Sequence, residues 1–260
     1  MSTPRILVIA GSDSGGGAGI QADIKTITML GGHAMTAITA VTAQNTLGVQ
    51  AVHLVPTAIV LAQIDSVVSD IGVDAVKIGM IGSAATAQAV ADRLEVLDVP
   101  IIFDPVMVAT SGATLADTDT IAAFERLMRI ATVVTPNLPE LTALGGEAAI
   151  LAHGCHLLVK GGHGEGDMVV DRLLSAAGEI ARHEGGRIDT TSTHGTGCTL
   201  ASALACGLGA GLPIEEAFAR AVEFVRLAIE RAPGLGQGHG PLGQQFVTDF
   251  RDKRSDPDDD

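Results

Sequence analysis

The 260-residue chain contains no tryptophan and no tyrosine, and only six phenylalanines. Basic residues are also scarce, because 16 lysines and arginines stand against 30 aspartates and glutamates, which gives a formal net charge of −14. Nucleic-acid binding depends on basic surfaces and, for single strands, on aromatic side chains that stack on the bases. The composition therefore predicts that nucleic acid is not a partner.

Cysteine is equally scarce. Cys155, Cys198 and Cys206 are odd in number and lack the paired spacing of metal ligands, which argues against a disulfide framework and against a zinc site. The apolar run at residues 6–10 is too short for a secretory signal, and no uncharged run is long enough to span a membrane. We therefore expect a cytoplasmic protein without a membrane partner.

Short β-branched runs alternate with longer amphipathic segments from the first residues onward. This alternation predicts an α/β protein with a mainly parallel central sheet and helices on both faces. There is no internal repeat and no strong linker, so we expect one domain over residues 1–246 and an acidic, disordered tail over residues 247–260. The predicted strands are 6–10, 34–41, 75–78, 100–103, 131–134 and 156–160, and the predicted helices are 18–30, 57–71, 84–97, 117–129, 196–210 and 214–231.

Glycines or polar residues directly follow five of the predicted strands. Because ligands of α/β sheets bind beyond the carboxyl ends of the strands, we expect these clusters to form one site. An acidic surface repels phosphate, so a phosphate ligand would need a local basic group. Lys77 and Lys160, each within an apolar strand-like segment, are the candidates. The five clusters begin at Gly11, Lys77, Asp104, Thr135 and Lys160.

The segment Gly195-Thr196-Gly197-Cys198-Thr199 is a glycine turn that leads into an apolar helical pattern. Backbone N–H groups at a helix N-terminus lack intrahelical acceptors and bind anions, and the same helix end favours a thiolate over a thiol. These residues therefore indicate phosphoryl transfer to a small hydroxylated substrate. The alternative is that the glycines only shape a turn and that Cys198 packs in the core.

A second glycine loop, residues 11–19, follows a strand and opens a helix, as a dinucleotide-binding loop does. A dinucleotide site would also require an acidic residue at the end of the second strand, about 20 residues further on. Residues 40–44 contain no carboxylate, so the sequence disfavours a dehydrogenase. A purely structural glycine turn remains the alternative.

Three further positions combine a strand end with a polar side chain. Asp104 precedes Pro105, where the strand must stop, and its carboxylate suits Mg²⁺, a substrate hydroxyl or a turn cap. Asn137 and Glu140 open a helix, so Glu140 either caps this helix or reaches Mg²⁺ directly or through water. Gln44 could present its amide to the nitrogen-rich edge of a heterocycle, or be an ordinary loop residue.

Seven segments, in the same order, resemble the ribokinase-like superfamily and most closely the hydroxymethylpyrimidine/phosphomethylpyrimidine kinase family of thiamin biosynthesis. They cover nearly the whole chain to about Phe246. Many members of the superfamily, ribokinase included, have aspartate where this chain has Cys198. The resemblance implies a three-layer ribokinase-like sandwich with a mainly parallel central sheet. The segments are residues 10–25, 42–46, 77–80, 104–107, 135–140, 158–163 and 193–199.

The resemblance also implies an activity, namely phosphorylation by ATP, with Mg²⁺, of 4-amino-5-hydroxymethyl-2-methylpyrimidine and then of its monophosphate. Pyridoxal or pyridoxine kinase activity on the same fold is the nearest alternative, and a non-catalytic nucleotide-binding module is another. Dimers are common in relatives, so a homodimer is expected.

The resemblance assigns roles residue by residue. Gly195, Thr196 and Gly197 would form the anion hole, and Cys198 would accept the proton of the substrate hydroxyl. Lys160 would contact ATP phosphates, with Thr199 and Asn137 beside it, while Glu140 and Asp104 would organise Mg²⁺. The pyrimidine pocket would consist of Gly11, Asp23, Gln44, Met80 and Val106.

Overall fold

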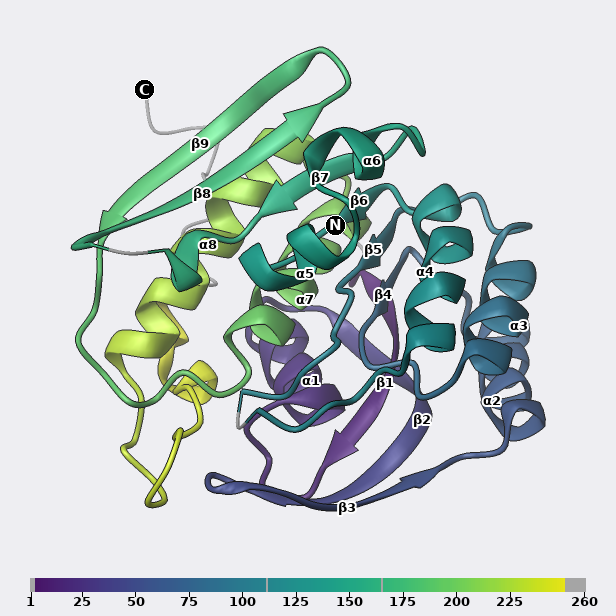
Figure 1. The fold of residues 1–260 in the computed structure, drawn as a ribbon, viewed down its shortest axis with the longest axis horizontal. Coiled ribbons are helices and arrows are strands. Elements are labelled where there is room, and N and C mark those ends of the chain that lie inside the picture. Colours follow the sequence, from purple (N-terminus) through teal and green to yellow (C-terminus); the bar gives the residue numbers. More distant parts are fainter. Residues whose placement is uncertain (1–2, 111, 165, 251–260) are drawn as a thin grey trace.

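The computed structural model describes residues 3–110, 112–164 and 166–250, and these contain one sheet of nine strands (Figure 1). The order across the sheet is β3-β2-β1-β4-β5-β6-β7-β8-β9. The strands are β1 (Arg5–Asp13), β2 (His33–Asn45), β3 (Gly48–Leu54), β4 (Ala75–Ile78), β5 (Ile101–Phe103), β6 (Val133–Val134), β7 (His156–Val159), β8 (Met168–Ser175) and β9 (Gly178–Gly186).

The strands from β2 to β7 in this order run parallel, whereas β3, β8 and β9 pair antiparallel at the two edges. The central strands are mostly apolar because helices cover both faces of the sheet. The helices are α1 (Gly19–Met29), α2 (Thr57–Asp70), α3 (Ala84–Leu94), α4 (Thr118–Ile130), α5 (Leu138–Ala143), α6 (Glu147–Leu151), α7 (Thr196–Gly209) and α8 (Ile214–Glu230).

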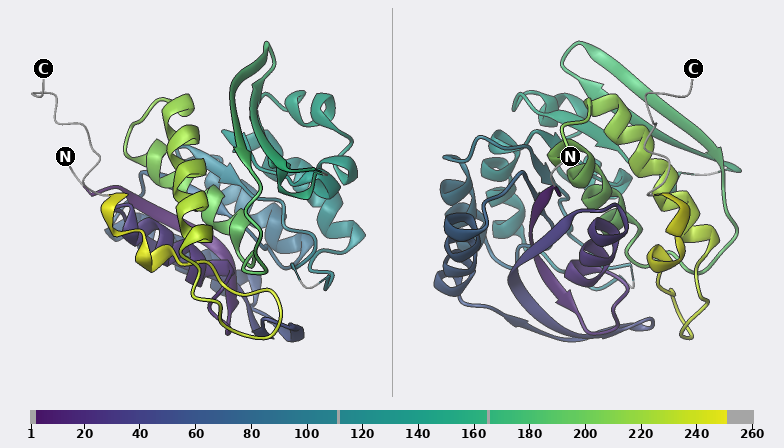
Figure 2. Two further views of the ribbon diagram at one scale, coloured as in Figure 1. Left: turned by 90° about the vertical axis from the view of Figure 1, so that its left-hand side faces the viewer. Right: turned by 180° about the vertical axis from the view of Figure 1, so that it is seen from behind.

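Two apolar cores lie on opposite faces of the sheet. Leu7 and Ile9 of β1 pack into the core under α2, α3 and α4, whereas Ile6 and Val8 pack into the core under α1, α7 and α8. The rear view in Figure 2 shows this second helical layer in front of the sheet. The predicted α/β architecture with helices on both faces is confirmed.

Three strands were absent from the sequence-based prediction. The side chains of β3 are exposed over most of its length, and those of β9 alternate between exposed and half-buried. The β8–β9 hairpin stands out from the body of the molecule (Figure 2). Edge strands that face solvent lack the apolar run that marks a buried strand, and charged side chains in them discourage pairing with other chains.

The boundary expected at residue 246 is too early. Val247 is completely buried and Phe250 is 2% exposed, and both belong to the core under α8. The Arg220 guanidinium of α8 lies 4.7 Å from the centre of the Phe250 ring. The disorder predicted for the rest of the tail concerns residues 251–260, which lie outside the described residues.

None of the helices in the described part of the chain combines the length and the apolarity that crossing a membrane requires.

Candidate active site

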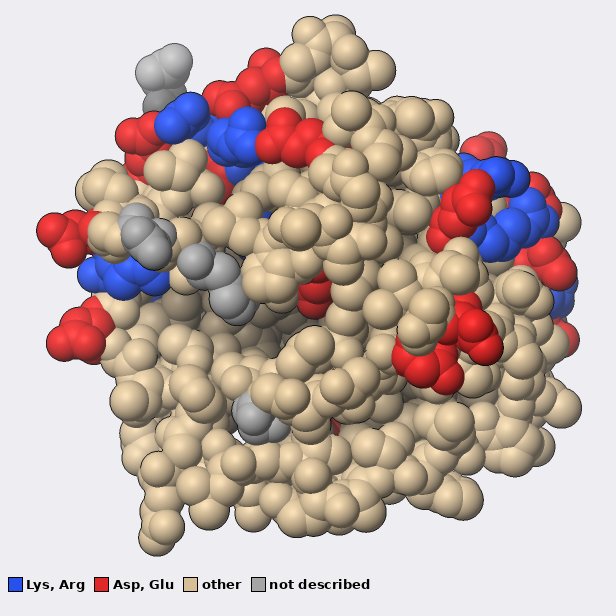
Figure 3. Space-filling model, viewed as in Figure 1, with Lys and Arg blue, Asp and Glu red and all other residues tan. Residues whose placement is uncertain are grey.

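The carboxyl ends of β1, β4, β5, β6 and β7 lie at one edge of the sheet, as the sequence predicts. The edge continues past β6 and β7, because Asn137 pairs with Lys160 in a parallel bridge and the Lys160 N–H donates to the Pro136 carbonyl at 3.2 Å. The face shown in Figure 3 is hollowed near its centre, and acidic atoms are visible at the bottom of the hollow.

The turn that begins α7 is packed against the glycine loop after β1. Gly195 has a φ of +87°, and a Cβ atom at this position would overlap the carbonyl oxygen of Gly17, so only glycine fits. The N–H groups of Thr196 and Thr199 donate to backbone carbonyls, at 3.3 and 2.9 Å. Among the described residues, no such acceptor is found for the intervening N–H groups of Gly197 and Cys198. Two backbone donors are therefore left for an anion.

A cation and a carboxylate lie beside this turn. Lys160 Nζ donates to Asp104 Oδ1 at 2.7 Å, and a Cβ atom at Gly197 would lie 3.0 Å from the same Nζ. Burial acts to lower the pKa of Lys160, but the charges of Asp104 and Glu140 outweigh it, so the pKa is raised. Lys160 therefore stays a cation, next to the free backbone donors.

Cys198 is a half-buried residue at the start of α7. Burial of the sulfur raises its pKa to about 11; Lys77 opposes the rise, whereas Asp23 and Asp104 add to it. The expectation that the helix end lowers this pKa is therefore wrong. Two nearby carboxylates and the loss of solvent outweigh the helix dipole, and the thiol is neutral at pH 7.

Glu140 forms the capping box of α5 with Asn137. The Asn137 N–H donates to Glu140 Oε2 at 2.8 Å, and the Glu140 N–H donates to Asn137 Oδ1 at 2.9 Å. Burial raises the pKa of Glu140, Lys160 acts against the rise, and Asp104 adds to it. Glu140 therefore caps α5, which is one of the two roles predicted from the sequence. Its carboxylate also belongs to the charged cluster around Lys160.

The carboxylates of Asp104 and Glu140 fit a metal ion that binds together with the phosphates of a substrate. The described residues contain no group of three side chains that could hold a metal ion by themselves. Mg²⁺ is usually held by one or two carboxylates together with waters and substrate phosphates. Asp104 and Glu140 fit this mode, because both carboxylates act on Lys160 beside the free donors of α7.

Four of the five residues predicted for the heterocycle lie around the same edge. A Cβ atom at Gly11 would lie 3.0 Å from Met80 Sδ, so these two residues are in contact. Val106 follows Asp104 directly, and its N–H donates to the Asp104 carbonyl at 2.8 Å. The Gln44 amide lies 3.2 Å from the His194 ring, next to the α7 turn.

Asp23 is the exception. Its carboxylate is completely buried and accepts hydrogen bonds from Lys77 Nζ, at 3.0 Å to both oxygens, and from Ser202 Oγ at 2.7 Å. A direct contact of this carboxylate with a pyrimidine is therefore not supported. Lys77 is completely buried as well, so the phosphate contact for which the sequence made it a candidate is not supported. Burial acts to lower the pKa of Lys77, but Asp23, Cys198 and Asp104 raise it, so it remains charged below the site.

Thr199 also differs from its expected role. The residue is completely buried, its N–H donates to the Gly195 carbonyl, and its hydroxyl accepts from Gln244 Nε2 at 3.0 Å. These contacts leave no surface from which Thr199 could bind phosphate, so the expected phosphate contact is not supported.

Ser202→Ala is expected to lower the free energy of unfolding by about 1–3 kcal/mol, because the buried Asp23 carboxylate loses a donor. Urea unfolding followed by circular dichroism measures the change. Ser69→Ala is the matched control, because the Ser69 hydroxyl bonds the Ser66 carbonyl on an exposed helix face. Equal losses of unfolding free energy in the two variants would contradict a structural role for the buried group of Asp23, Lys77 and Ser202.

Sequence reasoning missed Asp13 and His194. The Asp13 carboxylate accepts the N–H groups of Gly15, Gly17 and Ala18, at 2.8 to 3.0 Å, and therefore shapes the glycine loop. His194 bonds the same carboxylate from the other side of the site. An aspartate that precedes glycines after a strand is a signal for such a loop, whereas nothing in the sequence pairs it with a residue 181 positions away.

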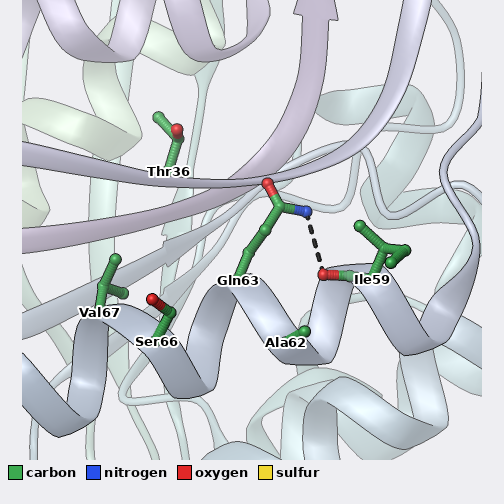
Figure 4. Close-up of a pocket in the computed structure, with 6 residues that line it drawn as sticks. All are labelled: Thr36, Ile59, Ala62, Gln63, Ser66 and Val67. Atoms are coloured by element: carbon green, nitrogen blue, oxygen red, sulfur yellow. Dashed lines mark hydrogen bonds between the residues drawn. The ribbon is translucent and has the colours of Figure 1, made fainter.

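A separate surface groove of about 340 Å³ lies over α2 and the outer edge of β2 (Figure 4). Gln63 spans it, accepting from the Ile38 N–H at 2.9 Å and donating to the Ile38 carbonyl at 3.2 Å. The amide thus replaces a strand partner for β2. None of the groove's lining residues is titratable, and neither hydroxyl among them has a neighbouring base in the groove, so we assign it no chemistry. Its lining residues are Thr36, Ile59, Ala62, Gln63, Ser66 and Val67.

Comparison with known proteins identifies the family. The family model for phosphomethylpyrimidine kinase matches residues 13–243. A hydroxymethylpyrimidine/phosphomethylpyrimidine kinase of Rhizobium meliloti is 48% identical over 257 residues, which cover 92% of this chain and 96% of that protein.

Solved structures of related kinases have the same fold as this chain. A Bacillus subtilis pyridoxal kinase in complex with ADP has a TM-score of 0.85 and 32% identity, covering 94% of this chain and 98% of its own. A phosphomethylpyrimidine kinase of Clostridium difficile has a TM-score of 0.74 and 34% identity, covering 88% of this chain and all of its own. The ribokinase-like fold expected from the sequence is therefore confirmed, and the chain belongs to the phosphomethylpyrimidine kinase family.

Proposed function

We propose that the protein transfers the terminal phosphoryl group of ATP to 4-amino-5-hydroxymethyl-2-methylpyrimidine and then to its monophosphate, a step of thiamin biosynthesis. One observation carries the proposal: two free backbone donors of the α7 turn lie beside the Lys160–Asp104 pair. The names of the family and of its relatives support the substrate. Structural neighbours in complex with ADP or with an ATP analogue support ATP as the co-substrate.

In the proposed reaction, the substrate oxygen attacks the terminal phosphorus of ATP, and the bond from this phosphorus to the bridging oxygen of ADP breaks. The N–H groups of Gly197 and Cys198, with Gly195 and Thr196 shaping the turn, bind the oxygens of the migrating group. A loose transition state needs this charge stabilisation and in-line placement above all. The hydroxyl proton passes to the Cys198 sulfur when that sulfur is a thiolate.

The charged cluster places the nucleotide. Lys160 neutralises phosphate charge, and Asn137, at the start of α5, lies next to it. Asp104 and Glu140 would hold Mg²⁺, which supplies charge neutralisation at the phosphates when it is bound. We also propose that the protein works in the cytoplasm as a homodimer, which sedimentation at working concentrations tests.

Pyridoxal phosphorylation is the second candidate, because a pyridoxal kinase of Staphylococcus aureus in complex with an ATP analogue and pyridoxal has a TM-score of 0.84. The two candidates are separated by comparing kcat/KM for the pyrimidine alcohol and for pyridoxal with Mg-ATP. A clear preference for pyridoxal would overturn the pyrimidine assignment. ATP binding without turnover of either alcohol would show a non-catalytic module instead.

Gln44→Leu is expected to weaken pyrimidine binding by about 1–3 kcal/mol, because the polar edge of the heterocycle loses its partner in a desolvated pocket. The KM for the pyrimidine, measured at saturating ATP, reports the effect. Gln50→Leu on β3 is the matched control, since Gln50 is exposed and bonds only its own turn. An unchanged KM in Gln44→Leu would place the heterocycle elsewhere.

A further inference from the structure

His194 lies at the centre of a hydrogen-bonded group that the proposed mechanism does not use. Its Nε2 atom lies 2.9 Å from Asp13 Oδ2 and 3.2 Å from Gln44 Nε2, and its Nδ1 atom lies 3.4 Å from Thr110 Oγ1. The residue is 7% exposed, and a Cβ atom at Gly17 would lie 2.5 Å from the ring. One imidazole thus joins the glycine loop, the end of β2 and the segment after β5.

Asp13 decides where the ring carries its proton. Oδ1 accepts from the Gly15 N–H, and Oδ2 accepts from the Gly17 and Ala18 N–H groups. Burial acts to raise the pKa of Asp13, but the hydrogen bonds from His194 and from the backbone outweigh it, so the pKa is lowered. The carboxylate is therefore ionised and is only an acceptor. Consequently His194 Nε2 carries a proton and donates it to Asp13.

The same Nε2–H group faces the Gln44 amide, and two N–H groups cannot bond each other. The oxygen and nitrogen of an amide have nearly the same shape, so the neighbours decide which of them faces the ring. The Thr42 hydroxyl lies 3.2 Å from the other amide atom of Gln44 and 3.0 Å from the Ser12 carbonyl. Thr42 donates to Ser12 and accepts from Gln44 only if the amide nitrogen faces Thr42 and the oxygen faces His194.

We propose that His194 is a positioning residue: its Nε2–H, shared between Asp13 Oδ2 and the carbonyl oxygen of the Gln44 amide, holds this amide and thereby offers one amide N–H to the substrate. This inference rests on the proposed function, in which Gln44 binds the heterocycle. It specifies the chemistry of that contact: the donor of Gln44 pairs with a ring nitrogen, which is an acceptor, and not with the exocyclic amino group, which is itself a donor.

A double-mutant cycle tests the coupling in the full chain. His194→Leu and Gln44→Leu should each raise the KM for the pyrimidine by about tenfold. The double variant should be no worse than Gln44→Leu alone, because His194 acts through Gln44. The KM for ATP should stay near the wild-type value in all three. His194→Gln, which keeps an N–H donor near the position of Nε2, should restore most of the binding.

A substrate analogue with C–H in place of a ring nitrogen separates positioning from a general effect on the glycine loop. A change in loop packing alone would not alter the ratio of kcat/KM for the substrate and the analogue. The wild type should discriminate against one such analogue by about tenfold or more in kcat/KM, and His194→Leu should lose the discrimination. If His194→Leu does not fold, Thr42→Val takes its place, because this near-isosteric change releases the other end of the amide. Additive effects in the double variant, or discrimination that survives both changes, would overturn the proposal.

The proposed function is tested separately, by measuring whether the wild type phosphorylates the pyrimidine. If the wild type phosphorylates pyridoxal instead, the same cycle is measured with pyridoxal, whose ring nitrogen is also an acceptor. Coupling between His194 and Gln44 there would support the positioning role, and additivity would overturn it.

Discussion

Gly195→Ala is expected to lower kcat about 10²- to 10³-fold, the usual cost of losing a donor from an anion hole. The left-handed φ of Gly195 and the overlap of an added Cβ atom with the Gly17 carbonyl leave the turn no room to keep its position. Displacing the turn moves the N–H groups of Gly197 and Cys198 away from the migrating phosphoryl group. Steady-state turnover with the pyrimidine alcohol and Mg-ATP measures the loss.

The control for this variant is Gly211→Ala, just beyond the other end of α7. Gly211 has a φ of +83°, similar to that of Gly195, but a Cβ atom there would meet nothing within 4 Å. Both variants introduce backbone strain, on the order of 1 kcal/mol, so both should lower the thermal midpoint. Only Gly195→Ala should lower kcat. Retention of wild-type turnover by Gly195→Ala would remove the turn from the mechanism.

Cys198→Ala is expected to lower kcat about 100-fold or more, the typical contribution of a positioned proton acceptor. The KM for the pyrimidine should change little, because a thiol contributes little to binding. Cys206→Ala is the matched control, since Cys206 is a buried residue of the same helix in the core under α8. Its kcat should remain near that of the wild type. If Cys198→Ala keeps full turnover, the sulfur is not the proton acceptor.

The pH dependence of the same reaction distinguishes the thiolate from the thiol. Burial raises the pKa of Cys198 to about 11, so the thiolate is a small fraction near neutrality. Below that pKa the thiolate fraction rises about tenfold per pH unit, and kcat should rise with it between about pH 7 and 9. In Cys198→Ala this rise should disappear. A flat profile in the wild type would mean that the proton leaves by another route.

The parts of the fold that the sequence predicted are those with a buried apolar run. Ile6 to Ala10 in β1 is almost completely buried and has an unbroken apolar pattern, so both the strand and the polar edge beyond it were predictable. The edge strands β3 and β9 were not, because most of their side chains face solvent and carry no distinct signal. Strand β8 was missed as well, because Asp171 and Arg172 interrupt its apolar residues. Val247 and Phe250 were missed because the following aspartates dominate the composition of the tail.

The site was predictable to the extent that its residues follow strand ends or form a helix start. Lys160 and Asp104 meet because β5 and β7 both end at the same edge of one sheet. Asp23 was misplaced because its partner, Lys77, lies 54 residues away, and only packing shows that the two charges neutralise each other in the core. The Cys198 pKa was predicted in the wrong direction because the sequence shows the helix start but neither the burial of the sulfur nor the neighbouring carboxylates.

A crystal structure with a non-hydrolysable ATP analogue, Mg²⁺ and the pyrimidine alcohol tests the central claim most directly. An oxygen of the terminal phosphate should lie within about 3.2 Å of the backbone nitrogens of Gly197 and Cys198, the range of an N–H···O hydrogen bond. A terminal phosphate bound out of reach of these two nitrogens would contradict the account.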